Sequence, residues 1–462
     1  MPLPGFRLVV LVLILAQATF SSAGEVLSER QSLDFHLDET VNLYQFLHSH
    51  PELSGEEVNT SRLLSEELTK AHAEVTTGVG GLGVVGVLRN GKGPTVLIRS
   101  DMDALPVTET TGVPYASCVT ADTDSGTKIG VMHACGHDVH MASLVGTARW
   151  LAEHKDLWAG TVLLVAQPSE ESACGARRML ADGLYTRFPR PDYALALHVS
   201  HDLEAGKVGY HVGPSMAGTT GVTITVNGRG GHGALPHTTV DPVVLASMLV
   251  LDLQTIVSRE VNPLDSAVLT VGSIRGGDKS NIIPETVTLG LTIRWFRPEV
   301  RDLILNGITR RARALATGHN APEPLVEVNG GTSPLVNEAG LVGKVVPAFQ
   351  EVLGDAFVSE IPPEMTAEDF GLYAQGGVPT FMFRLGTVSP QRWVQSEAHS
   401  KPLDSLHSPR FLPDSAPTLR TGVRAMSKAV ITLLPPARNI SGKFDDRASI
   451  LRHSLAQKAS RP

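Results

Sequence analysis

The sequence predicts an α/β protein in which a mostly parallel sheet, with helices on both faces, is interrupted by a smaller α+β domain. Three observations support this prediction. The chain has 462 residues, more than the ~100–200 residues of one ordinary domain. Short apolar strands alternate with helical segments in its first and last parts. Between them, the predicted order of strand, helix, two strands and helix is typical of a ferredoxin-like sandwich.

The first part of the larger domain covers residues 24–216. Its predicted helices are 43–47, 61–71, 141–151 and 174–183, and its predicted strands are 161–165 and 193–197. Short Val and Leu runs at 83–99 flank the turn sequence Asn90-Gly91-Lys92-Gly93. That pattern predicts a β-hairpin.

The smaller domain is predicted at residues 217–328, and the larger domain resumes at 329–437. The smaller domain is expected to contain strands at 222–226, 267–274 and 286–296 and helices near 241–257 and 298–317. A strand at 380–385 and a helix at 414–434 close the larger domain. The polar tail at 438–462 is assigned no function.

The first residues are typical of a secretory signal peptide rather than of the fold. Arg7 precedes an apolar run at 8–16, and the small residues Ser21-Ser22-Ala23 follow, so we expect residues 1–23 to be cleaved. The run is shorter than the ~20 apolar residues of a membrane span. No other stretch of the sequence is predicted to span a membrane. We therefore expect a secreted protein, extracellular or periplasmic, that has no membrane segment after cleavage.

Composition excludes several classes of protein. With 42% hydrophobic residues, the chain is not disordered. A net charge of −8 and the lack of a long basic run argue against binding nucleic acid by bulk electrostatics. Three cysteines are too few for a disulfide scaffold, although Cys118 and Cys174 could pair and leave Cys135 free.

A glycine-rich segment at 78–83 matches the dinucleotide pattern G-x-G-x-x-G. That motif binds a pyrophosphate only when a strand precedes it and a helix begins at it. Here a predicted helix precedes the segment and a β-rich run follows. We therefore predict a turn into a hairpin and no NAD site.

Side chains that can bind metals gather beside the predicted strands. Asp101 and Asp103 directly follow the apolar run at 96–98. The carboxyl ends of parallel strands face the crevice in which α/β proteins bind ligands. Cys135 and His137 come just before a predicted helix, and Gly136 lets the backbone turn tightly between them.

Two further segments follow the same rule. Glu170 and Glu171 follow the strand at 161–165, and His198 ends the strand at 193–197. Adjacent carboxylates in an extended segment point opposite ways, so one can bind metal while the other acts as a general base. Taken singly, each of these residues is more often an ordinary surface or core residue. A single two-metal site, suited to hydrolysis of an amide, explains all four segments together.

These motifs resemble the M20 metallopeptidase family, most closely its amidohydrolase branch of N-acyl-amino-acid, hippurate and auxin-conjugate hydrolases. The resemblance runs from about Leu47 to the 420s. The matching motifs are His50-Pro51-Glu52-Leu53, Met132-His133-Ala134-Cys135-Gly136-His137-Asp138, Gln167-Pro168-Ser169-Glu170-Glu171, Gly230-Gly231-His232-Gly233-Ala234-Leu235-Pro236-His237, Asn281-Ile282-Ile283-Pro284, Glu368-Asp369-Phe370 and His407-Ser408-Pro409-Arg410-Phe411.

The resemblance implies two divalent metal ions per subunit, either Zn²⁺ or Mn²⁺. The ligands that it implies are Cys135, His137, Glu171, His198 and His407. Cys135 would be the bridging thiolate. Asp101 stands where other M20 enzymes have a metal-binding His, so it is left out of the ligand set. Asp103 and Asp138 are better candidates for orienting the ligands.

Catalytic and substrate roles follow from the same resemblance. Glu170 would be the general base that moves a proton from water to the leaving amine. The smaller domain would be a lid and dimerisation domain, in which His232 reaches the partner's active site in a homodimer and stabilises the oxyanion. Asn281 and Arg294 are candidate contacts to the substrate carboxylate or the oxyanion.

The leading function is therefore a secreted dimetal amidohydrolase acting on N-acyl amino acids or related conjugates. A carboxypeptidase or dipeptidase on the same scaffold is the close alternative. A binding protein that uses metal structurally is less well supported, because such a site has no need of Glu170 beside Glu171. The expected partner is a small-molecule substrate rather than a nucleic acid.

Overall fold

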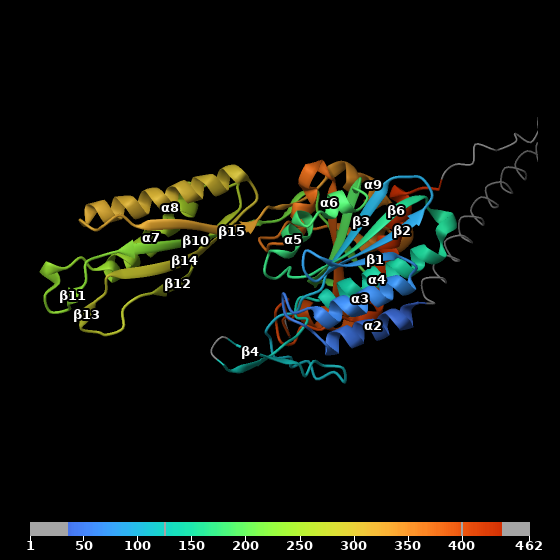
Figure 1. Ribbon diagram of the computed structural model, residues 1–462, viewed down its shortest axis with the longest axis horizontal. Helices are drawn as coiled ribbons and strands as arrows, with labels where there is room; N and C mark the ends of the chain where they lie inside the picture. Colours follow the sequence, from blue (N-terminus) through green and yellow to red (C-terminus); the bar gives the residue numbers. More distant parts are fainter. Residues whose placement is uncertain (1–35, 124–125, 399–400, 437–462) are drawn as a thin grey trace, which may run out of the picture.

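The computed structural model describes residues 36–123, 126–398 and 401–436, so the predicted signal peptide and polar tail lie outside the described residues. Figure 1 shows a larger domain built around one wide sheet and an elongated smaller domain beside it. The smaller domain, which we call the lid, is inserted into the sequence of the larger one.

An eight-stranded sheet forms the centre of the larger domain, in the order β1-β2-β6-β3-β7-β18-β8-β17. Its strands are β1 (Glu74–Val79), β2 (Gly83–Asn90), β3 (Thr95–Asp101), β6 (Gly160–Gln167), β7 (Tyr193–Glu204), β8 (Val208–Tyr210), β17 (Val358–Glu360) and β18 (Thr380–Val388). The central strands β6, β3, β7 and β18 are parallel, as predicted. Every residue of β3 and β18 is buried, as expected for strands covered on both faces.

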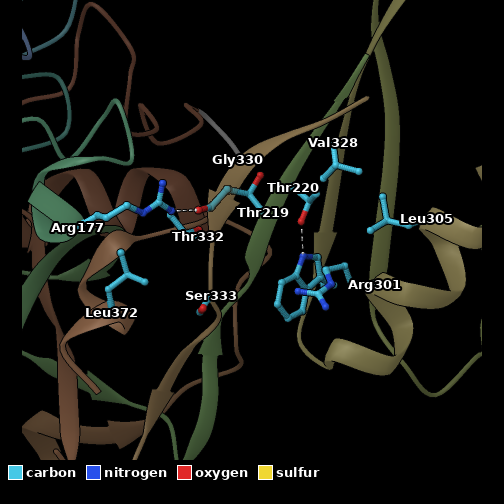
Figure 2. Close-up of a pocket in the computed structure, with 12 residues that line it drawn as sticks. Arg177, Thr219, Thr220, Arg301, Leu305, Val328, Gly330, Thr332, Ser333 and Leu372 are labelled. Carbon is cyan, nitrogen blue, oxygen red and sulfur yellow. Dashed lines mark hydrogen bonds between the residues drawn. The ribbon is translucent and has the colours of Figure 1, made fainter. Parts of the chain in front are cut away.

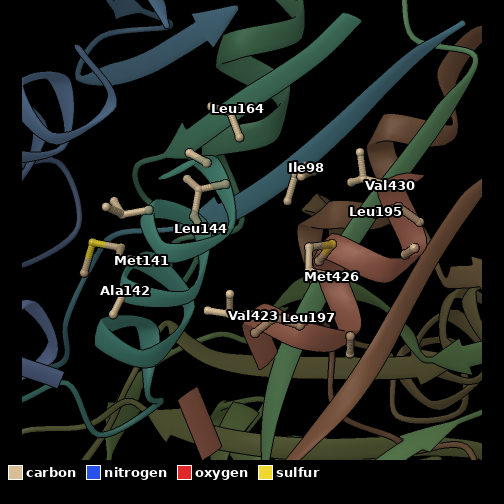
Figure 3. Packing of buried hydrophobic residues seen from close by; sticks show 14 of the residues in the cluster. Ile98, Met141, Ala142, Leu144, Leu164, Leu195, Leu197, Val423, Met426 and Val430 are labelled. Atoms are coloured by element: carbon tan, nitrogen blue, oxygen red, sulfur yellow. The ribbon is translucent and has the colours of Figure 1, made fainter. Parts of the chain in front are cut away.

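Helices cover both faces of this sheet. On one face lie α2 (Leu37–Ser49), α3 (Val58–Lys70), α4 (His137–Glu153), α9 (Ala339–Leu353) and α11 (Ser415–Leu433). On the other lie α5 (Gly175–Ala181), α6 (Leu184–Arg187) and the 3-10 segment η4 (Asp369–Gly377). Strand residues alternate between the two cores. Ile98 packs under α4 and α11 (Figure 3), whereas Leu97 belongs to the core beneath α5. Each such side chain, once fully buried, contributes ~1.5–3 kcal/mol.

The predicted hairpin at 83–99 is wrong. β2 and β3 are the expected strands, but β6 lies between them and pairs antiparallel with β2 and parallel with β3. The turn signal is local, whereas strand pairing is decided by a segment far along the chain. The glycine-rich segment is a turn, as predicted, and it joins β2 to the preceding strand β1, which the sequence did not predict.

The lid consists of a four-stranded antiparallel sheet, in the order β12-β14-β10-β15, with two helices. Its main elements are β10 (Gly218–Asn227), α7 (Pro242–Arg259), β12 (Ala267–Arg275), β14 (Thr286–Trp295), α8 (Pro298–Gly318) and β15 (Leu325–Thr332). Alternate residues of β10 and β14 are buried beneath the helices. β15, which the sequence did not predict, completes the ferredoxin-like order and carries the lid sheet to Thr332.

Short elements complete the described chain. They are β4 (Thr120–Asp122), β5 (Lys128–Gly130), β9 (Gly213–Met216), β11 (Gly231–His232), β13 (Ile282–Ile283), β16 (Leu335–Asn337) and α10 (Pro390–Glu397), with the 3-10 turns η1 (Lys155–Leu157), η2 (Pro236–Thr238) and η3 (Asp355–Phe357).

Close backbone contacts mark the junction between the lid and the larger domain. Gly331 has φ 140°, and a Cβ there would lie 2.0 Å from the carbonyl oxygen of Thr219, so a larger residue does not fit. Arg177 on α5 donates to the Gly331 carbonyl at 2.7 Å (Figure 2). On the lid side, Trp295 donates to the hydroxyl of Thr220 at 3.1 Å. A cavity of about 270 Å³ lies between these contacts.

The lid helix α7 is apolar on two sides. Its inner residues, Leu249 and Leu253 among them, are buried in the lid core. On the outer side Val244, Met248 and Leu251 are 53%, 40% and 73% exposed, at the i, i+4, i+7 spacing of one helix face. Within the described residues α7 is the one helix long and apolar enough to cross a membrane by length and composition, a test that core helices also pass.

A buried ion-pair network joins α2 to the rest of the larger domain. His48 Nδ1 lies 2.7 Å from Asp138 Oδ2, and its Nε2 lies 3.1 Å from Glu109 Oε1. Burial alone would lower the pKa of His48, but hydrogen bonds to the two carboxylates outweigh it and raise the pKa to about 9. Glu109 begins the arm that carries β4 and β5, so the charged imidazole holds α2, the arm and α4 together.

Candidate metal centre and active site

The carboxyl ends of the central strands place the site. β3 ends at Asp101, opposite Gln167 at the end of β6. His198 on β7 is the cross-strand neighbour of Arg384 on β18. The prediction that His198 ends its strand is wrong, because β7 continues to Glu204 in pairing with β18, but His198 still lies at the same side of the sheet as Asp101 and Gln167.

Backbone geometry brings Cys135 and His137 to the same edge. Gly136, between them, has φ 76°, and a Cβ there would lie 2.6 Å from a methyl of Val199. His137 Nδ1 donates to the carbonyl of Asp103 at 2.7 Å. Its Nε2 therefore points away from that bond, buried and without a hydrogen-bond partner in the described chain. An imidazole held in this way presents one nitrogen to a metal.

The predicted ligand atoms lie at coordination spacing. Cys135 Sγ is 3.4 Å from His407 Nε2 and 3.7 Å from His198 Nε2. Glu171 Oε1 is 3.6 Å from His407 Nε2 and 3.9 Å from His137 Nε2. Ligand atoms around a tetrahedral zinc ion lie ~3.5 Å apart. The structure therefore brings all five predicted ligands together.

Two sets of three ligands share one sulfur. Cys135, His137 and His198 form the first set, and Cys135, Glu171 and His407 form the second, each with ligand atoms within 4.8 Å of one another. Glu171 Oε1, like His137 Nε2, is buried and has no hydrogen-bond partner among the residues that the structure describes. Unpaired buried acceptors next to a thiol fit bound cations, and Cys135, which belongs to both sets, would hold both.

The ionisation of two ligands agrees with this arrangement. Burial lowers the pKa of His198, and the nearby His140 and Arg384 lower it further, so the ring is neutral. His198 Nδ1 donates to the Val199 carbonyl at 2.8 Å, so Nε2 faces Cys135 Sγ. Burial raises the pKa of the Cys135 thiol, with a contribution from Glu171. A thiolate in this position therefore needs a cation beside it.

The loop that carries Glu170 is held rigidly. Asp103 accepts hydrogen bonds from the backbone N–H of Glu170 and Glu171 at 3.1 and 3.0 Å. Ser169 has φ 56°, and its N–H donates to buried Glu57 at 2.7 Å. A Cβ at Gly175 would lie 1.7 Å from the Pro168 carbonyl, so the following helix must begin with glycine. Asp103 thus orients two parts of the site, the loop that carries Glu170 and the imidazole of His137.

Glu170 lies among buried carboxylates. Burial raises the pKa of Glu170 well above its usual range, and Glu368 and Asp369 raise it further. Behind them Arg99, fully buried, donates to Glu368 at 2.8 Å and to Asp369 at 2.9 Å. Its other amino group donates to Asp101 at 2.7 Å. Asp101 Oδ1 also lies 2.6 Å from His140 Nδ1, so both of its carboxylate oxygens have protein partners; its omission from the ligand set stays a prediction.

A cavity of about 470 Å³ opens over the ligands and reaches the lid. Arg294 on β14 lines it and has no hydrogen-bond or ion-pair partner among the described residues. Burial lowers the pKa of Arg294, so desolvation leaves this cation in need of an anion. The prediction that Arg294 contacts substrate remains open, and its position in the cavity is compatible with that role.

His232 and Asn281 lie elsewhere. They sit where β11 meets β13 on the lid, and the carbonyl of Asn281 accepts from the N–H of Gly233 at 2.9 Å. Neither lines the cavity of its own chain. Asp138 pairs with His48 instead of touching a ligand. Cys118 and Cys174 are both free, so the disulfide left open by the sequence is not formed.

Sequence reasoning missed Arg384 and Glu364, which line the same cavity. Arg384 follows the apolar run at 380–383, and this is the strand-end signal that identified His198. Glu368 was part of a recognised motif but had been given no role. Glu364 lies in a loop without any local signal.

Comparisons with known proteins agree with this site. The family model for peptidase family M20/M25/M40 matches residues 97–426. The chain is 37% identical to N-acetyl-L-cysteine deacetylase of Bacillus subtilis, over 76% of this chain and 81% of that protein. It is 36% identical to IAA-amino acid hydrolase ILR1-like 5 of Arabidopsis thaliana, over 81% and 82% of the two chains.

The fold is also similar to that of a solved M20 structure. The Bacillus subtilis YXEP protein, described as a dinuclear metal binding peptidase from the M20 family, has a TM-score of 0.70 and 27% identity, and covers 87% of this chain and 99% of its own. The ligand geometry, the family model and these relatives agree. The chain belongs to the M20 peptidase family and is a hydrolase of that family.

Proposed function

We propose that the protein is a secreted dimetal amidohydrolase that removes the acyl group from N-acyl amino acids or related amino-acid conjugates. The observation that carries the proposal is the pair of ligand sets sharing Cys135, with buried Glu170 beside them. When bound, Zn²⁺ or Mn²⁺ ions polarise the amide carbonyl and make water nucleophilic at neutral pH.

Glu170 is the residue that moves the proton. Its carboxylate takes a proton from the attacking water and delivers it to the leaving nitrogen, which departs as an amine. Its environment suits both halves of this task, because burial and neighbouring carboxylates raise the pKa of Glu170 and make it a stronger base. Asp103 fixes the loop so that Glu170 and Glu171 keep separate roles.

Arg294 binds the α-carboxylate of the substrate amino acid. It is half-buried in the cavity and has no partner among the residues described, and an arginine fork matches a carboxylate in geometry. This contact distinguishes amino-acid conjugates from simple amides.

The active site is completed by a second copy of the chain. His232 is exposed on its own lid and does not line its own cavity, which supports a role in the partner's site. The outer apolar face of α7 supports self-association through the lid. In this homodimer His232 stabilises the oxyanion of the partner's substrate.

The test is amino-acid release from a panel of N-acyl amino acids and dipeptides, using protein loaded separately with Zn²⁺ and Mn²⁺. Release from acyl conjugates is the expected result. Release from dipeptides alone would replace the proposal with the peptidase alternative. No release from any substrate by either metal form would favour a binding protein. N-terminal sequencing of the exported protein, expected to begin after Ala23, tests secretion.

A further inference from the structure

The cavity contains a second arginine that the proposed mechanism does not use. Arg384 lies on β18 as the cross-strand neighbour of the ligand His198, and it is only 4% exposed. One of its amino groups, Nη2, donates to Glu364 Oε2 at 3.0 Å. The same oxygen accepts from the hydroxyl of Thr366 at 2.9 Å. The guanidinium of Arg384 is therefore held beside the candidate metal ligands by the carboxylate of Glu364.

Arg384 has donors to spare. A guanidinium carries five N–H groups, and in the portion of the chain that the structure describes Glu364 is the one hydrogen-bond partner of Arg384. Both residues line the cavity, so the remaining N–H groups are available to its occupant. Arg294, the other arginine of the cavity, belongs to the lid wall and lies on a different element.

The described lining of the cavity contains few large apolar side chains. Among the described lining residues the apolar side chains are Ala173, Met216, Ala367 and Leu406, and none of the lining residues is Phe, Tyr or Trp. Pockets for large apolar ligands are lined mainly by hydrophobic and aromatic side chains. Residues with charged or hydroxyl side chains are the majority of the described lining residues.

We propose that Arg384 is a specificity-determining residue that selects conjugates bearing a second carboxylate in addition to the α-carboxylate. This inference rests on the proposed function, with Arg294 holding the α-carboxylate. The second carboxylate is on the amino-acid side chain or on a dicarboxylic acyl group, since both present the same chemistry to a guanidinium. Glu364 positions Arg384 and, by its charge, limits the strength of that selection.

Two isosteric substrate pairs test the proposal and identify the source of the carboxylate. N-acetylglutamate is compared with N-acetylglutamine, and N-succinylalanine with its terminal amide. In at least one pair kcat/KM is expected to favour the carboxylate by ~10- to 100-fold, the range of a charge-assisted hydrogen bond. Faster cleavage of a benzoyl or indolylacetyl conjugate than of any dicarboxylic one would overturn the proposal.

Two variants with opposite expected effects sharpen the test. Arg384→Met combined with Glu364→Gln removes both charges and is expected to reduce the preference to about onefold. Glu364→Gln alone frees the guanidinium and is expected to increase it. Arg62→Met with Glu66→Gln, an exposed Arg–Glu pair on α3, is the matched control and should leave the ratio unchanged. A ratio that neither cavity variant changes would assign the pair a structural role.

Direct binding separates this proposal from the proposed function. Glutarate is expected to bind the metal-loaded protein more tightly than butyrate, and the double variant should lose this difference. If no conjugate is hydrolysed, the proposed function fails, while the glutarate comparison still decides the role of Arg384. Equal binding of glutarate and butyrate by the unmodified protein would overturn the selection of a second carboxylate.

Discussion

The catalytic edge, where Cys135, His137, Glu171, His198 and His407 meet, differs from the lid tip, where β11 and β13 pair and His232 lies. At the catalytic edge, Cys135 and His137 are buried and contact the other ligands within one chain. At the lid tip, His232 is exposed, and its Nδ1 accepts from the N–H of Ala234 at 3.0 Å. The first region is brought together within a single chain, whereas the second lies outside the cavity of its own chain, and its proposed role requires a second copy.

This difference shows what strand topology can encode. A parallel sheet gathers distant segments at one edge, so a charged residue at a strand end becomes part of a site through folding alone. A residue on the lid's outer surface gains no such neighbours from its own fold. The following predictions test this division, beginning with the largest expected effect.

Glu170→Gln tests whether the catalytic edge carries the chemistry. The variant should lose ~10³- to 10⁴-fold in kcat because the proton acceptor is gone. Metal content, measured by elemental analysis, should not change, since Glu171 remains. Glu66→Gln on α3 is the surface control. Normal turnover by Glu170→Gln would mean that the chemistry is carried by another residue.

His232→Ala tests whether the lid acts across two copies. Loss of one oxyanion donor should reduce kcat ~10²- to 10³-fold without loss of metal. Mixing this variant with Glu170→Gln should restore about a quarter of normal activity, because random pairing creates one intact site in half of the dimers. If the mixture stays inactive while dimers exchange, His232 does not act in the partner's site.

Substitution of His48 tests how much the buried ion-pair network stabilises the larger domain. Its pKa is raised to about 9 in the folded protein from 6.5, so the folded state binds this proton more tightly. The stabilisation is therefore fully present below pH 6.5 and is lost as the pH rises to about 9. It amounts to roughly 3 kcal/mol at most. Urea unfolding of His48→Gln should show a flatter pH dependence over this window, with Asp138 and Glu109 charged throughout.

Leu251→Lys should have the smallest effect on folding. The side chain is 73% exposed on α7, so the free energy of unfolding of one chain should change by less than ~0.5 kcal/mol. Light scattering should nevertheless show a shift from dimer to monomer, and activity should fall as it does for His232→Ala. A monomer with full activity would show that the lid needs no second copy.

Much of the larger domain could be predicted because its signals are local. α3 and α11 have apolar residues at helical spacing, and the ligand residues lie beside apolar strands. β6 was expected as a strand, but its insertion between β2 and β3 depends on long-range pairing. β15 was missed because its Asn329-Gly330-Gly331 segment is typical of a turn.

The candidate site was predictable to a similar extent. The metal-binding types Cys, His and Glu stand out in an apolar setting, and the resemblance added His407, so all five side chains that the structure brings together had been named as predicted ligands. Arg384 carried the same positional signal, yet an arginine there is easily taken for a surface charge. Its burial depends on Glu364, which lies in a loop. Only folding shows that the two residues meet.

The position of β18 also has a consequence for biosynthesis. β18 pairs with β7 at the middle of the sheet, although the whole lid separates them in sequence. As the chain leaves the ribosome, the lid strands can pair with one another while β7, already paired with β3, still lacks β18 on its other side. A chain truncated before Thr380 would thus carry an assembled lid on an open apolar strand edge, and such edges recruit other chains into aggregates.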